Sequence, residues 1–434
     1  MRVSGDGCLQ LIDNVVQFRS GTASGSAGSR VKFGIIPGLD EVLVSIFRAP
    51  HSYTGEDMAE LSCHASPYVL GELLKLLGEA GARLAEPGEF TRRAFLNGKM
   101  DLAQAEAVAD IISSSSSAQH RLALNQLKGG FSAELEEIRS KLLELTTLME
   151  LELDFSEEDV EFADRSKLME LLSSSIGHCR RLADSFRVGN AVRNGVPVAI
   201  IGAPNSGKST LLNALLNDDR AIVSDIPGTT RDTVEETCII NGILFRFIDT
   251  AGIRSATDEI ERMGIERTYR KASESEIILG LINLSEHPTA ASVREAVKGL
   301  VGLSDQGHQR LIILGSKADL ANDCNVAPEL FDTEYLAISA KTGDGLDDLR
   351  RLLVRLSGIN AATGTLVTNE RHAQALSSTA DALSRVREGM NSGVPSDLLS
   401  EDLRAALESL GAITGYVTTD EILSNIFSRF CIGK

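Results

Sequence analysis

The spacing of apolar residues divides the chain into four regions. Residues 1–100 mix short strand-like runs, such as 42–47, with one helical pattern at about 67–80. Residues 101–190 and 366–434 are helical, while residues 194–356 combine strands with helices. The apolar positions that carry the two helical predictions are Leu135, Ile138, Leu142, Leu145 and Leu148, and then Leu383, Val386, Leu398, Leu403, Leu407 and Leu410.

Two further features bear on how these regions join. The serine run 113–117 is interpreted as a weak spot in the first helical region rather than a break, because apolar spacing continues on either side. A strand-and-helix region with helices before and after it suggests an insertion into one helical domain. We therefore expect domain boundaries at 1–98, 99–193, 194–356 and 357–434.

Composition limits the classes of protein that fit. Of 434 residues, 43% are hydrophobic and 24% charged, as in soluble globular proteins. Lys and Arg number 43 against 61 Asp and Glu, a formal charge of −18. Such a chain will not coat nucleic acid nonspecifically, so RNA binding would need a local basic patch or a partner.

Location can also be predicted from the sequence. The six cysteines form no C-x-x-C pair and fit a reducing cytoplasm. No run of 18 apolar residues predicts a membrane span, and the first residues do not resemble a signal peptide. We expect a cytoplasmic protein without a membrane partner.

The most specific motif is Gly202-Ala-Pro-Asn-Ser-Gly-Lys-Ser209, which matches the phosphate loop G-x-x-x-x-G-K-[ST]. It follows an apolar strand-like run and opens a helical pattern, as the motif requires. Its backbone N–H groups and the helix N-terminus can hold phosphates. Lys208 can reach the terminal phosphates as a catalytic cation, and Ser209 can ligate Mg²⁺.

Four more segments indicate a guanine nucleotide. Gly228-Thr-Thr-Arg-Asp232 offers Thr230, with Thr229 beside it, as a metal ligand that closes only over a γ-phosphate. Asp249-Thr-Ala-Gly252 matches D-x-x-G, and Ser316-Lys-Ala-Asp319 ends in an aspartate that can accept hydrogen bonds from guanine. The fourth segment, Ile338-Ser-Ala-Lys341, supplies backbone near the base. The predicted GTP contacts are Asn205, Ser206, Gly207, Lys208, Ser209, Thr210, Ser224, Asp225, Ile226, Pro227, Gly228, Thr229, Thr230, Asp249, Thr250, Ala251, Gly252, Ser316, Lys317, Ala318, Asp319, Ser339, Ala340 and Lys341.

Two positions depart from the usual GTPase pattern. Ser316 stands where asparagine is usual, so we expect weaker tethering of the phosphate loop and lower GTP affinity. Ile253 stands where a glutamine often orients the attacking water, so another group must do this. Spacing leaves three carboxylates as candidates, namely Asp258, Glu259 and Glu261.

These motifs, together with longer strings, resemble the MnmE (TrmE) family of tRNA-modification GTPases. The matching strings are Ser52-Tyr-Thr-Gly-Glu-Asp57, the stretch from Pro87 to Asp110, and the terminal Phe430-Cys-Ile-Gly-Lys434. The resemblance implies a multidomain α/β plus α fold. An N-terminal α/β domain would bind tetrahydrofolate and dimerise, a discontinuous helical domain would follow, and a P-loop GTPase domain with a mixed sheet and helices on both faces would be inserted in it.

The resemblance also implies an activity and partners. The family hydrolyses GTP when two G domains meet, with K⁺ in place of an arginine finger and with Mg²⁺. It forms homodimers and works on tRNA with the FAD-dependent partner MnmG (GidA), in a heterotetramer or larger complex. Together they install a carboxymethylaminomethyl or aminomethyl group on C5 of the wobble uridine. The one-carbon unit comes from a folate, as 5,10-methylene- or 5-formyl-tetrahydrofolate.

Carried onto this sequence, the resemblance implies residue roles. Ser209 and Thr230 would ligate Mg²⁺, and Glu261 would orient the water. K⁺ would be ligated by Asn205, Ser224, Ile226 and Thr229, and folate would be bound by Arg2, Glu60, Lys99 and Lys434. The family has further residues before the position of Arg2, so we expect a trimmed or partial N-terminus.

Several alternatives stay open. Cys431 can be either a structural or a catalytic thiol. The acidic stretch 154–161 could chelate a metal, although a solvated loop is the favoured interpretation. The chain could also be a ribosome-assembly or signalling switch with a vestigial folate domain, but no basic RNA-binding module supports this.

Overall fold

The computed structural model describes residues 1–154, 165–218, 235–249, 273–289, 292–293, 295, 298, 309–321, 333–359, 364–428, 430 and 433. The chain divides into two compact units. The first comprises residues 1–112, 125–176 and 378–434, and the second comprises residues 113–124 and 177–377. The domain boundaries expected from the sequence stay predictions.

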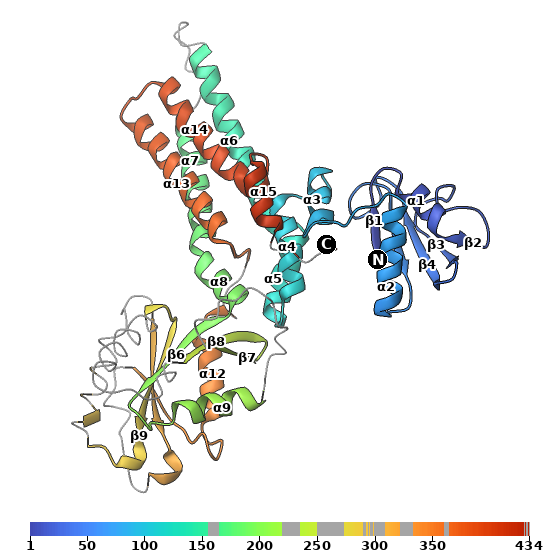
Figure 1. The fold of residues 1–434 in the computed structure, drawn as a ribbon. Helices are drawn as coiled ribbons and strands as arrows, with labels where there is room; N and C mark the ends of the chain where they lie inside the picture. Colours follow the sequence, from blue (N-terminus) through green and yellow to red (C-terminus); the bar gives the residue numbers. More distant parts are fainter. Residues whose placement is uncertain are drawn as a thin grey trace, which may run out of the picture. The chain divides into compact units, whose positions relative to one another are not determined.

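The first unit begins with a five-stranded antiparallel sheet (Figure 1). Its strand order is β1-β5-β4-β3-β2. The strands are β1 (Arg2–Ser4), β2 (Gln17–Phe18), β3 (Arg30–Ile36), β4 (Asp40–Phe47) and β5 (Met58–Ser62). The predicted strand at 42–47 and the predicted helix at 67–80 are both confirmed, the latter as α2 (Pro67–Glu79).

One face of this sheet carries the core of the N-terminal part. Helices α1 (Cys8–Val15) and α2 bury Leu9, Ile12, Leu73 and Leu77 in a cluster with apolar residues of β4 and β5. Residues alternate between faces along a strand. Val31, Ile35 and Leu43 are exposed while Val42, Val44 and Ile46 are buried, so the sheet is apolar on both faces but covered on one.

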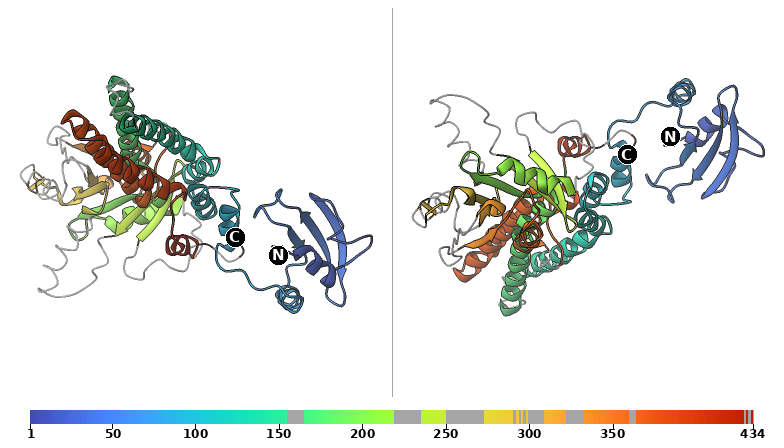
Figure 2. Two further views of the ribbon diagram at one scale, coloured as in Figure 1. Left: turned by 90° about the horizontal axis from the view of Figure 1, so that it is seen from above. Right: turned by 90° about the horizontal axis from the view of Figure 1, so that it is seen from below.

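The helical part of the first unit joins distant segments. It includes α3 (Glu89–Leu96), α4 (Leu102–Ser113), α6 (Gly130–Asp154), α14 (Ser396–Thr414) and α15 (Asp420–Phe427). Helix α14 packs beside α6, as Figures 1 and 2 show. Helix α15 packs on α3, and its Leu423 and Phe427 join Phe430, Leu102 and Ala105 in one buried cluster.

The leucine pattern predicted α6 well. Leu135, Ile138, Leu142 and Leu145 are all buried, whereas Leu148 is half-buried and Met149 takes the next core position. Leu398 and Leu403 both lie in the predicted helical region, within α14, where Leu398 is 57% exposed and Leu399 is buried. Pro395, directly before α14, does not change this spacing of apolar residues. The 3.6-residue turn places Leu399, Leu403 and Leu410 on one face.

The serine run proves to be a break, so its interpretation as a weak spot within a helix was wrong. Helix α4 ends at Ser113 and α5 (Ser117–Leu127) begins four residues later. Gln119 accepts hydrogen bonds through Oε1 from the backbone N–H groups of Ser115 (2.9 Å) and Ser116 (2.9 Å). These bonds satisfy the free N–H groups at the start of α5, and a helix running through the segment would not need them.

The second unit is built on a six-stranded mixed sheet in the order β11-β10-β9-β6-β8-β7. Only β7 (Glu235–Ile240) and β8 (Ile243–Asp249) pair antiparallel. The parallel strands are β6 (Val196–Gly202), β8, β9 (Ile277–Asn283), β10 (Arg310–Ser316) and β11 (Glu334–Ala337). Parallel strands end at the same edge, so this topology gathers the strand-end motifs there.

Both faces of the second sheet carry apolar clusters. Val198, Ile200 and Phe245 belong to a cluster with α9 (Lys208–Asp218) and α12 (Leu346–Leu356). Ala199, Ile201 and neighbours from β9 and β10 form a second cluster. The remaining helices are α7 (Arg165–Asp184), α8 (Phe186–Asn194) and α13 (Glu370–Asn391), with 3₁₀ turns η1 (Leu284–Glu286) and η2 (Ala318–Leu320). The predicted fold class is confirmed.

Candidate functional site

The phosphate loop runs between β6 and α9, as the motif predicted. Gly207 and Asn205 have φ angles of 95° and 61°, so the chain turns through left-handed conformations there. A Cβ on Gly202 would lie 2.7 Å from Ser206 Oγ and 2.9 Å from the Leu281 carbonyl oxygen. Only glycine fits at position 202, which lets the loop close tightly over the end of the strand.

Lys208 folds back over this loop. Its Nζ donates to the carbonyl oxygens of Gly202 (2.7 Å) and Ala203 (2.9 Å). Because Lys208 is the first residue of α9, its ammonium group lies beside the N-terminus of that helix. A bound phosphate would lie in the same place, where the helix N–H groups and the ammonium group both favour negative charge.

Ser316 holds the loop from the neighbouring strand end. Its buried Oγ lies 2.6 Å from the Ser206 carbonyl oxygen and 3.1 Å from that of Ile282. The hydroxyl therefore does tether the phosphate loop to β10 and β9. It has a single hydrogen to donate, where an asparagine amide has two. Lower GTP affinity stays a prediction.

The guanine-recognition segments are joined by hydrogen bonds. Ser339 Oγ donates to Asp319 Oδ1 at 2.7 Å, and the Ala318 N–H donates to the Ile338 carbonyl oxygen at 3.1 Å. Ser339 is fully buried, whereas Asp319 is exposed. The buried hydroxyl thus fixes the carboxylate that would receive guanine, and these two loops form one wall of the site.

The first residue of the D-x-x-G motif lies at the same edge. Asp249 is the last residue of β8 and pairs in register with Ile200 on β6, two residues before the phosphate loop. Residues 205–210, 316–319 and 339–341 are the other described segments of the predicted GTP site. The structure thus brings them and Asp249 to one edge of the sheet. The predicted residues Ser224, Asp225, Ile226, Pro227, Gly228, Thr229, Thr230, Thr250, Ala251, Gly252 and Glu261 lie outside the described residues.

The first unit contains a separate cavity of about 500 Å³. Arg2, Cys8, Glu89, Arg93 and Gly433 are among its lining residues. Sequence reasoning had named Arg2 but missed Glu89 and Arg93, although both lie in the long string that carries the family resemblance. The available signal in the sequence was that charged Glu89 and Arg93 alternate with apolar Phe90 and Ala94 on a short helix.

Arg2 is held in this cavity by several groups. Its Nη2 and Nε lie 2.7 and 2.9 Å from Glu60 Oε1, so the two predicted folate residues pair directly. The guanidinium also lies over the rings of Tyr53 (5.1 Å) and Phe90 (5.4 Å). Lys99 donates to the Pro50 carbonyl oxygen at 3.0 Å and is not a lining residue. Lys434 and Cys431 lie outside the described residues.

Ionisation differs sharply between two groups of the cavity. The pKa of Glu89 is lowered to about 2, chiefly by its hydrogen bond with Arg83 and less by Arg93. The pKa of the Cys8 thiol is raised to about 11 because burial disfavours the thiolate, with Asp57 adding to the effect. Glu89 is therefore a fixed negative charge at neutral pH, and Cys8 is an unreactive thiol.

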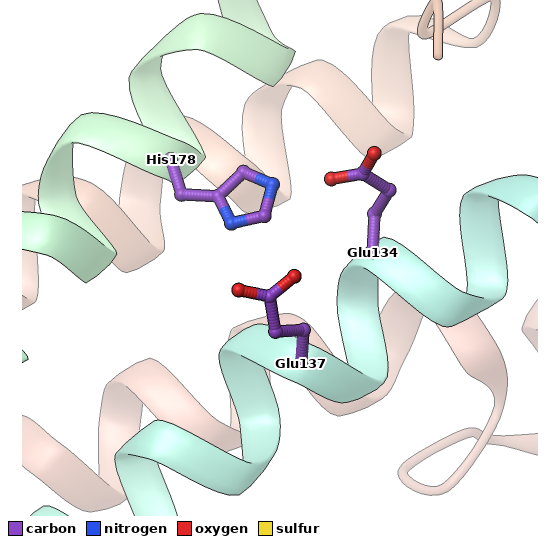
Figure 3. Close-up of side chains that lie close together, drawn as sticks. All are labelled: Glu134, Glu137 and His178. Atoms are coloured by element: carbon purple, nitrogen blue, oxygen red, sulfur yellow. The ribbon is translucent and has the colours of Figure 1, made fainter. Parts of the chain in front are cut away.

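A second group of ionisable side chains belongs to helices α6 and α7. Figure 3 shows Glu134 and Glu137 on α6 and His178 on α7. Glu134 and Glu137 belong to the first compact unit and His178 to the second, so they form no site within either unit. In the described ranges, no helix has the length and apolar character needed to cross a bilayer.

Comparisons with known proteins agree with the geometry. Residues 1–99 match the family described as GTP-binding protein TrmE N-terminus, and residues 102–431 match the MnmE helical domain. A tRNA modification GTPase MnmE from Parabacteroides distasonis is 48% identical over 100% of this chain and 96% of its own length. Another from Bacteroides thetaiotaomicron is 51% identical over 91% of this chain and 86% of its own.

Among solved structures, Aquifex aeolicus Era bound to GDP and AlF₄⁻ is 27% identical. The match covers 43% of this chain and 66% of that one, with a TM-score of 0.29. The two family matches span residues 1–99 and 102–431, and the Parabacteroides distasonis relative matches over the whole chain. The chain belongs to the MnmE (TrmE) family of GTPases.

Proposed function

We propose that this chain hydrolyses GTP in the service of tRNA modification. The carrying observation is similarity over the whole chain to curated tRNA modification GTPases, at 48% identity across 100% of it. The geometry of the second unit supports the same activity. A phosphate loop, an aspartate that suits guanine and the D-x-x-G aspartate lie at one edge of a parallel sheet.

The residues present fit a nucleotide with its metal ions. Ser209, at the start of α9, and Thr230 would hold Mg²⁺ between the β- and γ-phosphates. Asn205, with Ser224, Ile226 and Thr229, would hold K⁺. Asn205 has a left-handed φ, which changes the direction of the loop backbone at this residue. K⁺ would offset the charge that develops when the γ-phosphate leaves.

Water activation is assigned to Glu261. Isoleucine at position 253 has no group that can hydrogen-bond to water, so a residue outside the D-x-x-G segment must orient it. Glu261 would accept a hydrogen bond from the attacking water and align it with the γ-phosphate. Lys208 and Thr230 would meanwhile stabilise the charge on the phosphate oxygens.

The cavity of the first unit fits a folate. Its volume of about 500 Å³ lies within the range of small-molecule sites, roughly 300–1,000 Å³. Arg2 supplies a cation to the cavity, and Glu60, which pairs with Arg2 but is not a lining residue, would accept from a pterin ring. Lys99 and Lys434 would add positive charge toward the glutamate tail. We propose that 5,10-methylene- or 5-formyl-tetrahydrofolate supplies the one-carbon unit transferred to the wobble uridine.

Assembly and location complete the proposal. The exposed side chains of Val31, Ile35 and Leu43 leave one face of the N-terminal sheet open to a second copy of the chain. We propose a homodimer through this domain that meets the FAD-dependent MnmG (GidA) partner in the cytoplasm. GTP hydrolysis would then be switched on when two G domains approach each other.

Potassium dependence provides the sharpest test of the nucleotide chemistry. Steady-state GTP hydrolysis should be much faster in K⁺ buffer than in Na⁺ buffer at equal ionic strength, since Na⁺ fits the same ligands poorly. Calorimetry with 5-formyl-tetrahydrofolate on the same preparation should show binding. Equal rates in the two salts would contradict the K⁺ site, and absent folate binding would contradict the role of the first cavity.

A further inference from the structure

A small pocket in the second unit lies where strands β9 and β10 begin. Its volume is about 190 Å³. Three arginines line it from three elements, namely Arg187 on α8, Arg310 at the start of β10 and Arg355 near the end of α12. We call this group the arginine pocket. Glu276, just before β9, lines it as well.

The arginine pocket is separate from the nucleotide site. Arg310 is the first residue of β10, and Ser316, which touches the phosphate loop, is the last. Six residues of strand separate them, which at about 3.3 Å per residue is roughly 20 Å. The parallel strands therefore carry the GTP site at one edge and the arginine pocket at the other.

The local charge is opposite in sign to that of the chain. Arg355 pairs with Glu334 at 2.6 Å, and Arg187 faces the half-buried Glu276. The Arg310 side chain has no hydrogen-bond or ion-pair partner among the residues that the structure describes. The pocket is thus lined by three guanidinium groups and one carboxylate, on a chain of net charge −18.

Size and chemistry limit the ligand. At about 190 Å³ the pocket is smaller than the roughly 300 Å³ at which small-molecule sites begin, so it suits a single group rather than a nucleotide. Guanidinium donors match the oxygens of a phosphate, to which they bind in pairs. The Arg355 side chain is 64% exposed, so a phosphate that belongs to a larger molecule can reach it.

We propose that the arginine pocket binds a phosphate group, and that this group belongs to the backbone of the tRNA. The inference rests on the proposed function, because a tRNA substrate makes a phosphate contact necessary. A strongly acidic chain repels a polyanion, so it must gather arginines where the RNA touches it. Free inorganic phosphate is the other source with the same chemistry.

The test measures binding of an unmodified tRNA transcript to the full chain at several salt concentrations. Arg310→Ala and Arg355→Ala should each weaken binding several-fold and reduce the slope of log K against log salt by about one. Arg351→Ala is the matched control, since Arg351 lies on the same helix, pairs with Asp348 and is 71% exposed. It should leave the slope unchanged. GTP hydrolysis by Arg310→Ala should equal that of the wild type.

The outcomes separate the possibilities. If wild-type chain binds tRNA and all three variants show its salt slope, the inference is wrong and the proposed function stands. If wild-type chain neither binds nor modifies tRNA, the proposed function itself fails. In a second arm, inorganic phosphate would raise the unfolding temperature of the wild type but not of Arg310→Ala if the pocket takes free phosphate. Unchanged tRNA binding together with that result would replace tRNA by free phosphate as the source.

Discussion

Single hydroxyls and carboxylates set the geometry of the nucleotide site. Ser316 connects two strand ends to the phosphate loop, and Ser339 fixes Asp319. Both serines are buried, and the bonds of Ser316 are formed away from competing water, whereas Asp319 is exposed. The site therefore depends at the residue scale on groups that touch no ligand but position those that do.

Replacing Ser316 by alanine should weaken nucleotide binding. The change leaves the Ser206 carbonyl oxygen without its strand-end partner, which costs about 1–3 kcal/mol for a buried group. GDP affinity measured by fluorescence should fall about tenfold or more. Ser357→Ala is the matched control, because it removes another buried hydroxyl of the same unit, which bonds to Val354 instead. Equal GDP affinity in Ser316→Ala and the wild type would show that this bond does not hold the loop.

Glu261→Ala should separate binding from chemistry. The predicted guanine and phosphate contacts do not include Glu261, so GTP affinity should stay nearly that of the wild type. Loss of the group that orients the water should lower kcat by roughly 10²–10⁴-fold, measured in single-turnover experiments. Glu259→Ala is the comparison variant. If Glu261→Ala turns over normally and Glu259→Ala does not, Glu259 orients the water.

At the scale of elements, the C-terminus is a docked helix with a short extension. Leu423, Phe427 and Phe430 are buried against α4, and the Phe427 and Phe430 rings lie 5.4 Å apart. Gly88 lies so close that a Cβ there would be 2.8 Å from the Phe427 carbonyl oxygen. Gly433 then lines the cavity of the first unit, so the end of the chain reaches the proposed folate site.

Removing residues 432–434 should therefore abolish folate binding while the fold persists. The buried anchors of α15 all precede the deletion, so the far-ultraviolet circular-dichroism spectrum should not change. Calorimetry with 5-formyl-tetrahydrofolate gives the affinity, and Lys434→Ala distinguishes loss of the ammonium group from loss of the backbone. Unchanged affinity in the truncated chain would remove the C-terminus from the site.

Sequence periodicity predicted elements better than their ends. The recurrence of apolar residues identified the core of α6, because burial against a partner requires such a stripe. It could not tell which of the adjacent Leu398 and Leu399 faces the core, because both are apolar. It failed at the serine run, where the break depends on Gln119 reaching back to two backbone N–H groups.

The candidate sites were likewise predictable from the sequence only in part. The phosphate loop and the D-x-x-G aspartate were predictable, because their motifs require glycine turns and charged groups at strand ends. That the Ser316 hydroxyl reaches the loop was not visible in the sequence, and its weaker tethering relative to asparagine stays a prediction. The arginine pocket was not predictable, because its residues come from positions 187, 310 and 355 and meet only in the folded chain.

At the scale of the whole molecule, two chemistries share one chain. The second unit carries the nucleotide site, and the first carries the cavity proposed for folate. GTP hydrolysis alone would make the first cavity unnecessary, whereas the proposed modification of the wobble uridine would use both a one-carbon donor and a GTP-driven switch. The central claim is therefore that GTP hydrolysis by this chain supports wobble-uridine modification.

The most direct test measures wobble nucleosides by mass spectrometry. Bacteria that lack their own family member would express either this chain or its Lys208→Ala variant, which loses the phosphate-loop ammonium group. The account predicts that the wild type restores aminomethyl-type groups on C5 of the wobble uridine and that Lys208→Ala does not. Unmodified wobble uridine in cells that contain folded, GTP-hydrolysing wild-type chain would contradict it.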